Sequence, residues 1–209
     1  MTAQPHPSTG AFIAFEGLDG VGKTTLVESV AAALGAVPLA MPGVPRPVAH
    51  AVFASFGHDA TSRALFHAAC ARAIGQQARA ITATGRHVVV DRYWLSSIAY
   101  ARARAVCIDL TAVELAIPAP NLTLLLMIDE DERCRRLEAR GATAVDRESM
   151  DRTFRDAAIA EMMRVDRHTN FETPVAVDLS FRTPSDSLSM VLDTLRQHGV
   201  HSTLPEHER

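Results

Sequence analysis

The sequence predicts an α/β three-layer sandwich with a mostly parallel five-stranded sheet. Short apolar runs alternate along the chain with longer segments that have helical spacing. The runs are apolar throughout rather than at every second residue, which is typical of parallel strands buried on both faces. Because 209 residues suit one domain, we expect a single domain over residues 11–199, with flexible tails at 1–10 and 200–209.

Four of the apolar runs are rich in β-branched residues or leucine, and they predict buried strands at residues 11–16, 87–91, 122–128 and 175–179. A weaker fifth candidate begins at Gly35. Helical spacing predicts helices at residues 61–84, 95–105, 131–140 and 149–165. Thr111 and Glu114 have the spacing of a capping box, and Thr183-Pro184 and Gly199 enclose a last helix.

The composition is that of a globular protein without a nucleic-acid-binding surface, since 47% of residues are hydrophobic and the net charge is -3. The longest apolar stretch is too short to span a bilayer, and the first residues lack the pattern of a signal peptide. Three widely separated cysteines favour neither a disulfide framework nor a zinc site. We therefore expect a cytoplasmic protein without a nucleic-acid or membrane partner.

The segment GLDGVGKTT contains Lys23, which is the one lysine among 21 basic residues. With Gly17, Gly22 and Thr24 it matches G-x-x-x-x-G-K-[ST], the P-loop pattern, between a predicted strand and a predicted helix. Backbone amides of such a loop bind nucleotide phosphates, and a compact ammonium fits where a forked guanidinium does not. The predicted ATP-binding residues are Gly17, Leu18, Asp19, Gly20, Val21, Gly22, Lys23, Thr24 and Thr25, and they indicate the P-loop NTPase type of fold.

The run VVVDR ends a predicted buried strand in a carboxylate. P-loop proteins hold a magnesium-bound water with such a residue, so Asp91 and the hydroxyl of Thr24 are the predicted contacts for Mg²⁺. Arg92 follows directly and would point into the crevice at the carboxyl end of the sheet. The plainer alternative is a surface pair of Asp91 and Arg92 that closes the strand.

The stretches FIAFEGLDGVGKTT, LFHAAC, DRYWLSSIAY and NLTLLLMIDEDERCRRLEARG…DRES resemble, in order and spacing, the thymidylate kinase family of nucleoside monophosphate kinases. The likeness covers roughly residues 11–165. It implies a homodimer that uses ATP and Mg²⁺ to phosphorylate a deoxynucleoside monophosphate, most simply dTMP. Within that likeness, Asp19 matches a carboxylate near the acceptor sugar and Arg92 an arginine that bridges the two phosphates.

The same resemblance implies further acceptor-binding residues. Phe66 matches the aromatic that stacks on the base, and Ser97 falls where a polar contact to the base is expected. Tyr100 matches the tyrosine placed against the sugar, where it disfavours a 2′-hydroxyl.

A lid is expected around residues 136–150, with a mobile loop at 140–149 between two helices. Because Gly20 occupies the loop position where some members carry arginine, the resemblance implies that a lid arginine neutralises the transferring phosphoryl group. Arg140 and Arg147 are the preferred candidates. Arg136 is equally well explained by a surface pair with Glu132, four residues earlier.

The chain departs from the family at two positions that contact the acceptor phosphate. Ala40 and Met41 replace an Arg-Glu pair after the second strand, and Cys70 stands where the family carries arginine. Arg46 could compensate in part, while Cys70 could equally be a small buried residue.

The departures leave open a kinase whose acceptor carries no phosphate. A non-catalytic nucleotide-binding protein is a third reading, because fold does not fix function.

Overall fold

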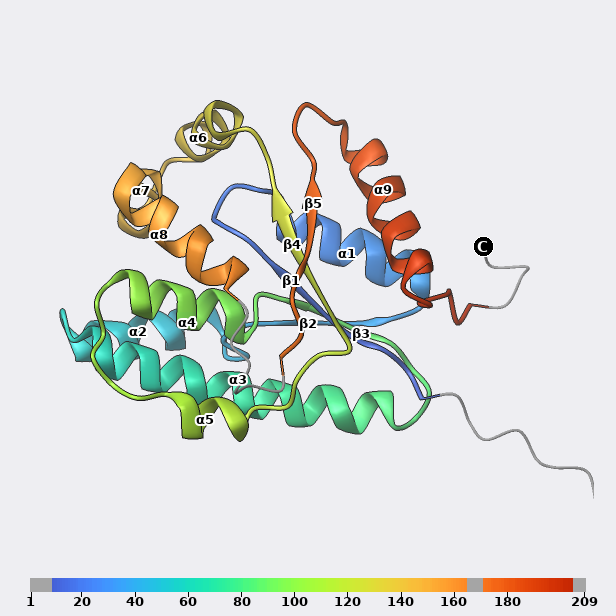
Figure 1. Ribbon diagram of the computed structural model, residues 1–209, viewed down its shortest axis with the longest axis horizontal. Helices are drawn as coiled ribbons and strands as arrows, with labels where there is room; N and C mark the ends of the chain where they lie inside the picture. The colour runs from blue at the N-terminus through green and yellow to red at the C-terminus, as the bar shows by residue number, and fades with distance from the viewer. Residues whose placement is uncertain (1–8, 165–170, 205–209) are drawn as a thin grey trace, which may run out of the picture.

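The computed structural model describes residues 9–164 and 171–204, without the side chains of Arg46 and Thr111. Within these residues one sheet has the strand order β2-β3-β1-β4-β5, and every neighbouring pair is parallel (Figure 1). The strands are β1 (Phe12–Glu16), β2 (Val37–Ala40), β3 (Val88–Asp91), β4 (Leu122–Met127) and β5 (Val175–Asp178). The predicted fold class and all five predicted strands are confirmed.

Helices lie on both faces of the sheet. They are α1 (Lys23–Leu34), α2 (Arg46–Phe56), α3 (Ala60–Thr82), α4 (Trp94–Ala103), α5 (Thr111–Leu115), α6 (Glu130–Ala139), α7 (Ala144–Met150), α8 (Arg152–Met163) and α9 (Pro184–Gln197). The described helices include none long and apolar enough to cross a membrane.

Alternate residues of β1 pack into different hydrophobic clusters, which explains the three layers. Ile13 and Phe15 belong to a cluster with apolar residues of α1 and α9, whereas Phe12 and Ala14 belong to one with α3. The central strand is therefore buried on both sides. Its carboxyl end, next to that of β3, opens at the point where the strand order reverses, which is where α/β folds bind ligands.

Helix α2, which contains Arg46, is not among the predicted helices. The helix begins in a proline-rich segment, where Pro47 occupies one of its first two positions. Proline is tolerated there because the first amides of a helix have no partner within the helix. The prolines of this segment therefore mark the start of a helix.

Two other local predictions are wrong. Most of the expected mobile loop at 140–149 is helix α7, which a capping box between Thr143 and Asp146 begins. Thr111, expected to cap a helix, is instead the first residue of α5, and Leu110 holds the cap position. Only residues 140–143 therefore remain between α6 and α7.

The ends of the domain extend further than predicted. Val200 is 5% exposed, and the amide of Thr203 donates to the carbonyl of Leu34 at 3.0 Å. The Nε2 atom of His87 lies 2.7 Å from the carbonyl of His201. Residues 200–204 thus pack against the end of α1 and the start of β3 instead of forming a tail, while the expected tails at 1–8 and 205–209 lie outside the described residues.

Candidate active site

The loop between β1 and α1 has the backbone that its glycines permit. Gly17, Gly20 and Gly22 have φ values of 134°, 91° and 93°, which side chains with a Cβ rarely adopt. A Cβ on Gly17 would lie 2.4 Å from the carbonyl oxygen of Leu126. The loop therefore passes close to β4 and leads directly into the amino-terminal end of α1, which favours an anion.

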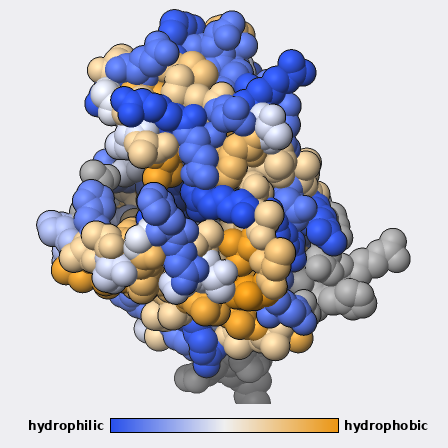
Figure 2. Space-filling view, turned by 90° about the vertical axis from the view of Figure 1, so that its left-hand side faces the viewer, coloured by the Kyte–Doolittle hydropathy of each residue, from blue (hydrophilic) through white to orange (hydrophobic). Residues whose placement is uncertain are grey.

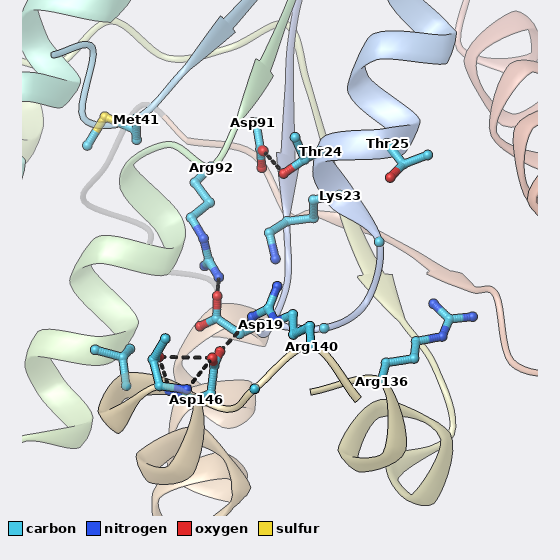
Figure 3. A pocket seen from close by; sticks show the side chains of 15 residues that line it. Asp19, Lys23, Thr24, Thr25, Met41, Asp91, Arg92, Arg136, Arg140 and Asp146 are labelled. Atoms are coloured by element: carbon cyan, nitrogen blue, oxygen red, sulfur yellow. Dashed lines mark hydrogen bonds and ion pairs between the residues drawn. The ribbon is translucent and has the colours of Figure 1, made fainter. Parts of the chain in front are cut away.

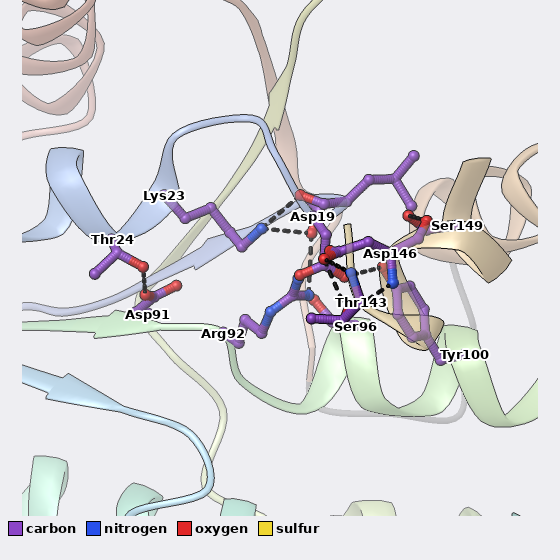
Figure 4. Close-up of polar contacts among 12 residues, drawn as sticks. Asp19, Lys23, Thr24, Asp91, Arg92, Ser96, Tyr100, Thr143, Asp146 and Ser149 are labelled. Carbon is purple, nitrogen blue, oxygen red and sulfur yellow. Dashed lines mark hydrogen bonds and ion pairs between the residues drawn. The ribbon is translucent and has the colours of Figure 1, made fainter. Parts of the chain in front are cut away.

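Lys23 points back into this loop (Figures 3 and 4). Its Nζ donates to the carbonyls of Gly17 at 2.9 Å and Leu18 at 2.6 Å, and the residue is 6% exposed. Burial, followed by the positive charge of Arg92, lowers its pKa to about 7, although neighbouring carboxylates oppose the shift. An anion in the loop would favour the charged ammonium.

Thr24 and Asp91, the two predicted contacts for Mg²⁺, lie side by side although 67 positions separate them in the sequence. The Thr24 hydroxyl donates to Oδ2 of Asp91 at 2.5 Å. The other oxygen, Oδ1, is buried and has no hydrogen-bond partner among the described residues. A hydroxyl and an unpaired carboxylate oxygen are ligands that suit Mg²⁺, which binds through few protein groups plus phosphate oxygens.

Arg92 stands at the junction of β3 and α4 with φ of 61°. Its guanidinium donates to Oδ1 of Asp19 at 2.5 Å and to the carbonyl of Gly17 at 3.2 Å. Tyr100 donates its hydroxyl to the other Asp19 oxygen at 3.2 Å. Burial would raise the pKa of Asp19, but the charges of Arg92 and Lys23 outweigh burial and lower it to about 2.

Glu16 is a fully buried carboxylate that the sequence interpretation did not single out. It accepts hydrogen bonds from the backbone amide of Tyr93 at 3.1 Å and from the hydroxyl of Ser96. Burial raises its pKa, despite the hydrogen bond from Ser96 and the charge of Arg92. Tyr93 holds the cap position of α4 but provides no side-chain cap. Glu16, at the end of β1, binds the Tyr93 amide instead and so fixes the turn between β3 and α4 that carries Arg92.

A second residue that the sequence interpretation missed is Arg133, which joins the P-loop to the lid. Its side chain is 1% exposed. It donates to the carbonyl of Asp19 at 2.8 Å, to the hydroxyl and carbonyl of Ser149, and through two bonds to Glu130. All five donors of the guanidinium are used. The Glu130–Arg133 spacing in the sequence suggests only an ordinary surface pair.

The other lid arginines differ in position. Arg140, 54% exposed, pairs with the buried Asp146 at 2.7 Å, while Arg136 pairs with Glu132 as its spacing predicted. Arg136 and Arg140 both border the cavity in front of the P-loop (Figure 3). Arg147 is exposed and does not line that cavity, because α7 turns this position away.

Two adjoining cavities lie on this side of the molecule, where Figure 2 shows a recess between an upper and a lower block. The loop cavity, of about 720 Å³, is bordered by the P-loop, Asp91, Arg136 and Arg140. The helix cavity, of about 500 Å³, is bordered by residues of α2, α3 and α4. Asp19 and Arg92 line both cavities.

The helix cavity contains only part of the acceptor set expected from the sequence. Ser97 and Tyr100 line it, together with Asp19 and Arg92. Phe66 and Cys70 do not line it, because α3 presents positions 60, 63, 64 and 67 to the cavity. At 100° per residue, Phe66 and Cys70 lie roughly 70–110° away from this face. The side chain of Arg46 lies outside the described residues.

The cavity residues that were not predicted include Phe53, Arg63, His67 and Arg104. The spacing of Arg63 and His67, four residues apart, was the available signal. Burial, and then the charges of Arg104, Arg92 and Arg63, lowers the pKa of His67 to about 4. The helix cavity therefore presents arginines and a neutral imidazole at pH 7.

A parallel sheet with a P-loop, a carboxylate at the end of β3 and an arginine between two cavities defines a P-loop kinase of small acceptors. The sequence profile described as thymidylate kinase matches residues 51–173. This chain belongs to the thymidylate kinase family.

Curated relatives agree with that assignment. The chain is 33% identical over 135 residues to a probable thymidylate kinase of Pyrobaculum calidifontis, covering 62% of this chain and 70% of that protein. It is 29% identical over 133 residues to a probable thymidylate kinase of Methanococcus vannielii, covering 62% and 66%.

Solved structures show the same fold. Thymidylate kinase from Candida albicans superposes with a TM-score of 0.74 at 20% identity, covering 93% of this chain and 94% of that one. Thymidylate kinase from Ehrlichia chaffeensis gives a TM-score of 0.58 at 22% identity, covering 90% and 99%.

Replacing Arg133 by methionine should destabilise the fold by about 3 kcal/mol, because the substitution leaves buried partners of the guanidinium unpaired. The same substitution at the exposed Arg135, two residues along α6, should cost less than about 0.5 kcal/mol. Urea unfolding of both variants measures the difference. Equal losses would show that the Arg133 contacts contribute no stability.

The lowered pKa of His67 should make stability depend on pH. Between its ordinary pKa of 6.5 and about 4, the unfolded chain binds a proton here that the folded chain does not. The stability of the parent should therefore fall relative to His67→Asn as the pH decreases from 6.5 to 4. Urea unfolding across this range tests it, with His58→Asn, at an exposed position, as the control. A constant difference would contradict the burial of a neutral imidazole.

Proposed function

We propose that this chain transfers the γ-phosphoryl group of ATP to the 5′-phosphate of dTMP, giving ADP and dTDP. One observation carries the proposal: Arg92 and Asp19 line both the loop cavity and the helix cavity. A phosphoryl group that crosses from one cavity to the other stays beside the same guanidinium. Membership of the thymidylate kinase family supports ATP as the donor and dTMP as the acceptor.

On the donor side, the amides of the P-loop would bind the β-phosphate, and Lys23 would follow the charge that moves between the β- and γ-phosphates. ATP would displace the Lys23 ammonium from the loop carbonyls that it now contacts. Thr24 and Asp91 would hold Mg²⁺, which neutralises charge on the β- and γ-oxygens when bound.

Between the cavities, Arg92 would stabilise negative charge on the transferring oxygens. Asp19 and Tyr100 orient this arginine, since both are bonded into the same cluster. Arg140 is the lid residue best placed to help, because it borders the loop cavity and its exposed side chain can turn towards the phosphates. Arg147 would need a rearrangement of α7 to do the same.

On the acceptor side, Arg63, Arg92 and Arg104 line the helix cavity. Arg92 and Arg104 are paired with Asp19 and Glu148, whereas Arg63 donates to the carbonyl of Gly57. The excess of arginine over carboxylate would favour an anion in a cavity to which Ala40 and Cys70 bring no charge. An acceptor without a phosphate would not use this charge. The comparisons give no support to that alternative.

A homodimer and a cytoplasmic location remain part of the proposal. The dimer depends on the family resemblance alone, and sedimentation equilibrium would decide it. The three cysteines, which are free thiols in the structure, suit a reducing compartment.

Purified protein with ATP, Mg²⁺ and dTMP should form ADP and dTDP in equal amounts, while thymidine should not be phosphorylated. Lys23→Met should lower kcat by at least about 100-fold, since it removes the cation that faces the transferring phosphate. Arg86→Met, which removes an exposed cation next to β3's amino end, is the matched control. Turnover of thymidine in place of dTMP, or full activity of Lys23→Met, would contradict the proposal.

A further inference from the structure

Among the described residues, three line both the loop cavity and the helix cavity: Asp19, Arg92 and Val145. Asp19 and Arg92 form the charge pair on which the proposed function depends. Val145 belongs to α7 in the lid, and its side chain is the apolar one of the three. Val145 therefore borders the junction of the two cavities, where the donor and acceptor phosphates of the proposed reaction would meet.

Val145 differs from its neighbours in the lid. The other lid residues that border the loop cavity are polar or lack a side chain: Arg136, Arg140, Gly141, Thr143 and Asp146. Val145 is 44% exposed. Single exposed valines are common on protein surfaces, but this one lies at a junction that is otherwise lined by charged groups. Because an apolar side chain cannot bind a phosphate, its effect on a reaction at the junction comes through water.

Helix α7 is fixed to two other helices by arginine side chains. Arg104, at the end of α4, donates from Nε to Oε1 of Glu148 at 2.9 Å and through a second N–H to Oε2 at 2.5 Å. Arg133 of α6 donates to the hydroxyl and carbonyl of the next residue, Ser149. A two-bond pair such as Arg104–Glu148 fixes orientation as well as distance. These contacts hold α7, and with it Val145, in place.

The start of α7 lies close to the charge pair. Figures 3 and 4 both show Asp146, the residue after Val145, beside Asp19. Asp146 is 2% exposed, accepts hydrogen bonds from the amide and hydroxyl of Thr143 and pairs with Arg140. The backbone around Val145 is thus fixed, and a β-branched side chain in a helix has one strongly preferred rotamer. The two methyl groups of Val145 therefore have a defined position at the junction.

Water is the competing acceptor in the proposed reaction. In the transfer, a phosphate oxygen of dTMP forms a bond to the γ-phosphorus of ATP while the bond to the β–γ bridging oxygen breaks, giving ADP and dTDP. If the oxygen of a water molecule forms that bond instead, the products are ADP, inorganic phosphate and a proton. Lys23 and Arg92 would stabilise both reactions, so the charges of the site do not discriminate between them. The outcome depends on whether water reaches the junction.

We propose that Val145 excludes water from the junction of the two cavities, so that the γ-phosphoryl group passes to the acceptor and not to water. The proposal rests on the proposed function and adds the residue that sets the ratio of transfer to hydrolysis. Methyl groups offer a water molecule no hydrogen bond. The exclusion of water also strengthens the attraction between Arg92 and phosphate oxygens. Asp19 and Arg92 cannot exclude water, because both are charged.

The test measures dTDP and inorganic phosphate formed from ATP and Mg²⁺ by the intact chain, with and without dTMP. Val145→Thr keeps the branched shape and replaces a methyl group by a hydroxyl, which can hold a water molecule. It should raise the ratio of phosphate released to dTDP formed by about 3- to 10-fold, the range for one hydrogen bond. Val145→Ile, which stays apolar, should leave this ratio within about twofold of the parent.

Val48→Thr is the matched control, because Val48 is 48% exposed on α2 and borders neither cavity. It should leave the ratio unchanged. The KM for ATP should stay within about threefold in Val145→Thr, since the P-loop is intact. An unchanged ratio in Val145→Thr, or an equal rise in Val145→Ile, would overturn the proposal. Thermal unfolding of each variant identifies effects that come from lost folding.

The two proposals fail in different ways. A parent protein that forms no dTDP from dTMP contradicts the proposed function. Phosphate release from ATP in the presence of dTMP then still tests Val145, because hydrolysis does not require transfer to the acceptor, and Val145→Thr should release phosphate faster than the parent. A parent protein that forms dTDP and releases phosphate at equal rates would overturn the exclusion of water and leave the proposed function standing.

Discussion

The ion pair between Arg92 and Asp19 is the contact on which the arrangement of the site depends. It joins the end of β3 to the P-loop after β1, and it forms where the two cavities meet (Figure 4). Asp19 is positioned by the hydroxyl of Tyr100 and by the bond from Arg133 to its carbonyl. Arg92 is positioned by the turn before α4, which Glu16 fixes. Strands, lid and acceptor helices therefore converge on one charge pair.

The sheet and the phosphate-binding elements could be predicted from the sequence because their signals are local. A buried parallel strand is an unbroken apolar run, and the P-loop is a fixed spacing of glycines before a helix. The two predicted Mg²⁺ contacts also lie together, since Asp91 ends β3 and Thr24 lies in the first turn of the helix after β1, and the carboxyl ends of these paired parallel strands lie at one edge of the sheet. The parallel pairing of β1 and β3 brings the residues that carry these local signals into one site.

The parts that could not be predicted depend on side chains that meet across the fold. Nothing next to Arg133 in the sequence indicates that its partners include the carbonyl of Asp19, 114 positions away. The orientation of α3 decides whether Phe66 or His67 faces the cavity. The other wall includes α2, a helix that begins in a proline-rich segment. Periodicity gives the faces of a helix but not which face turns towards a neighbour.

The saturation of Arg133 restricts how the lid can flex. Because every N–H of the Arg133 guanidinium donates a hydrogen bond, α7 cannot slide relative to the P-loop without leaving a buried donor unpaired. Gly141, by contrast, has open space around it and φ of 82°. Conformational freedom between α6 and α7 is therefore left to the four-residue link at 140–143, which includes Arg140 as well as Gly141.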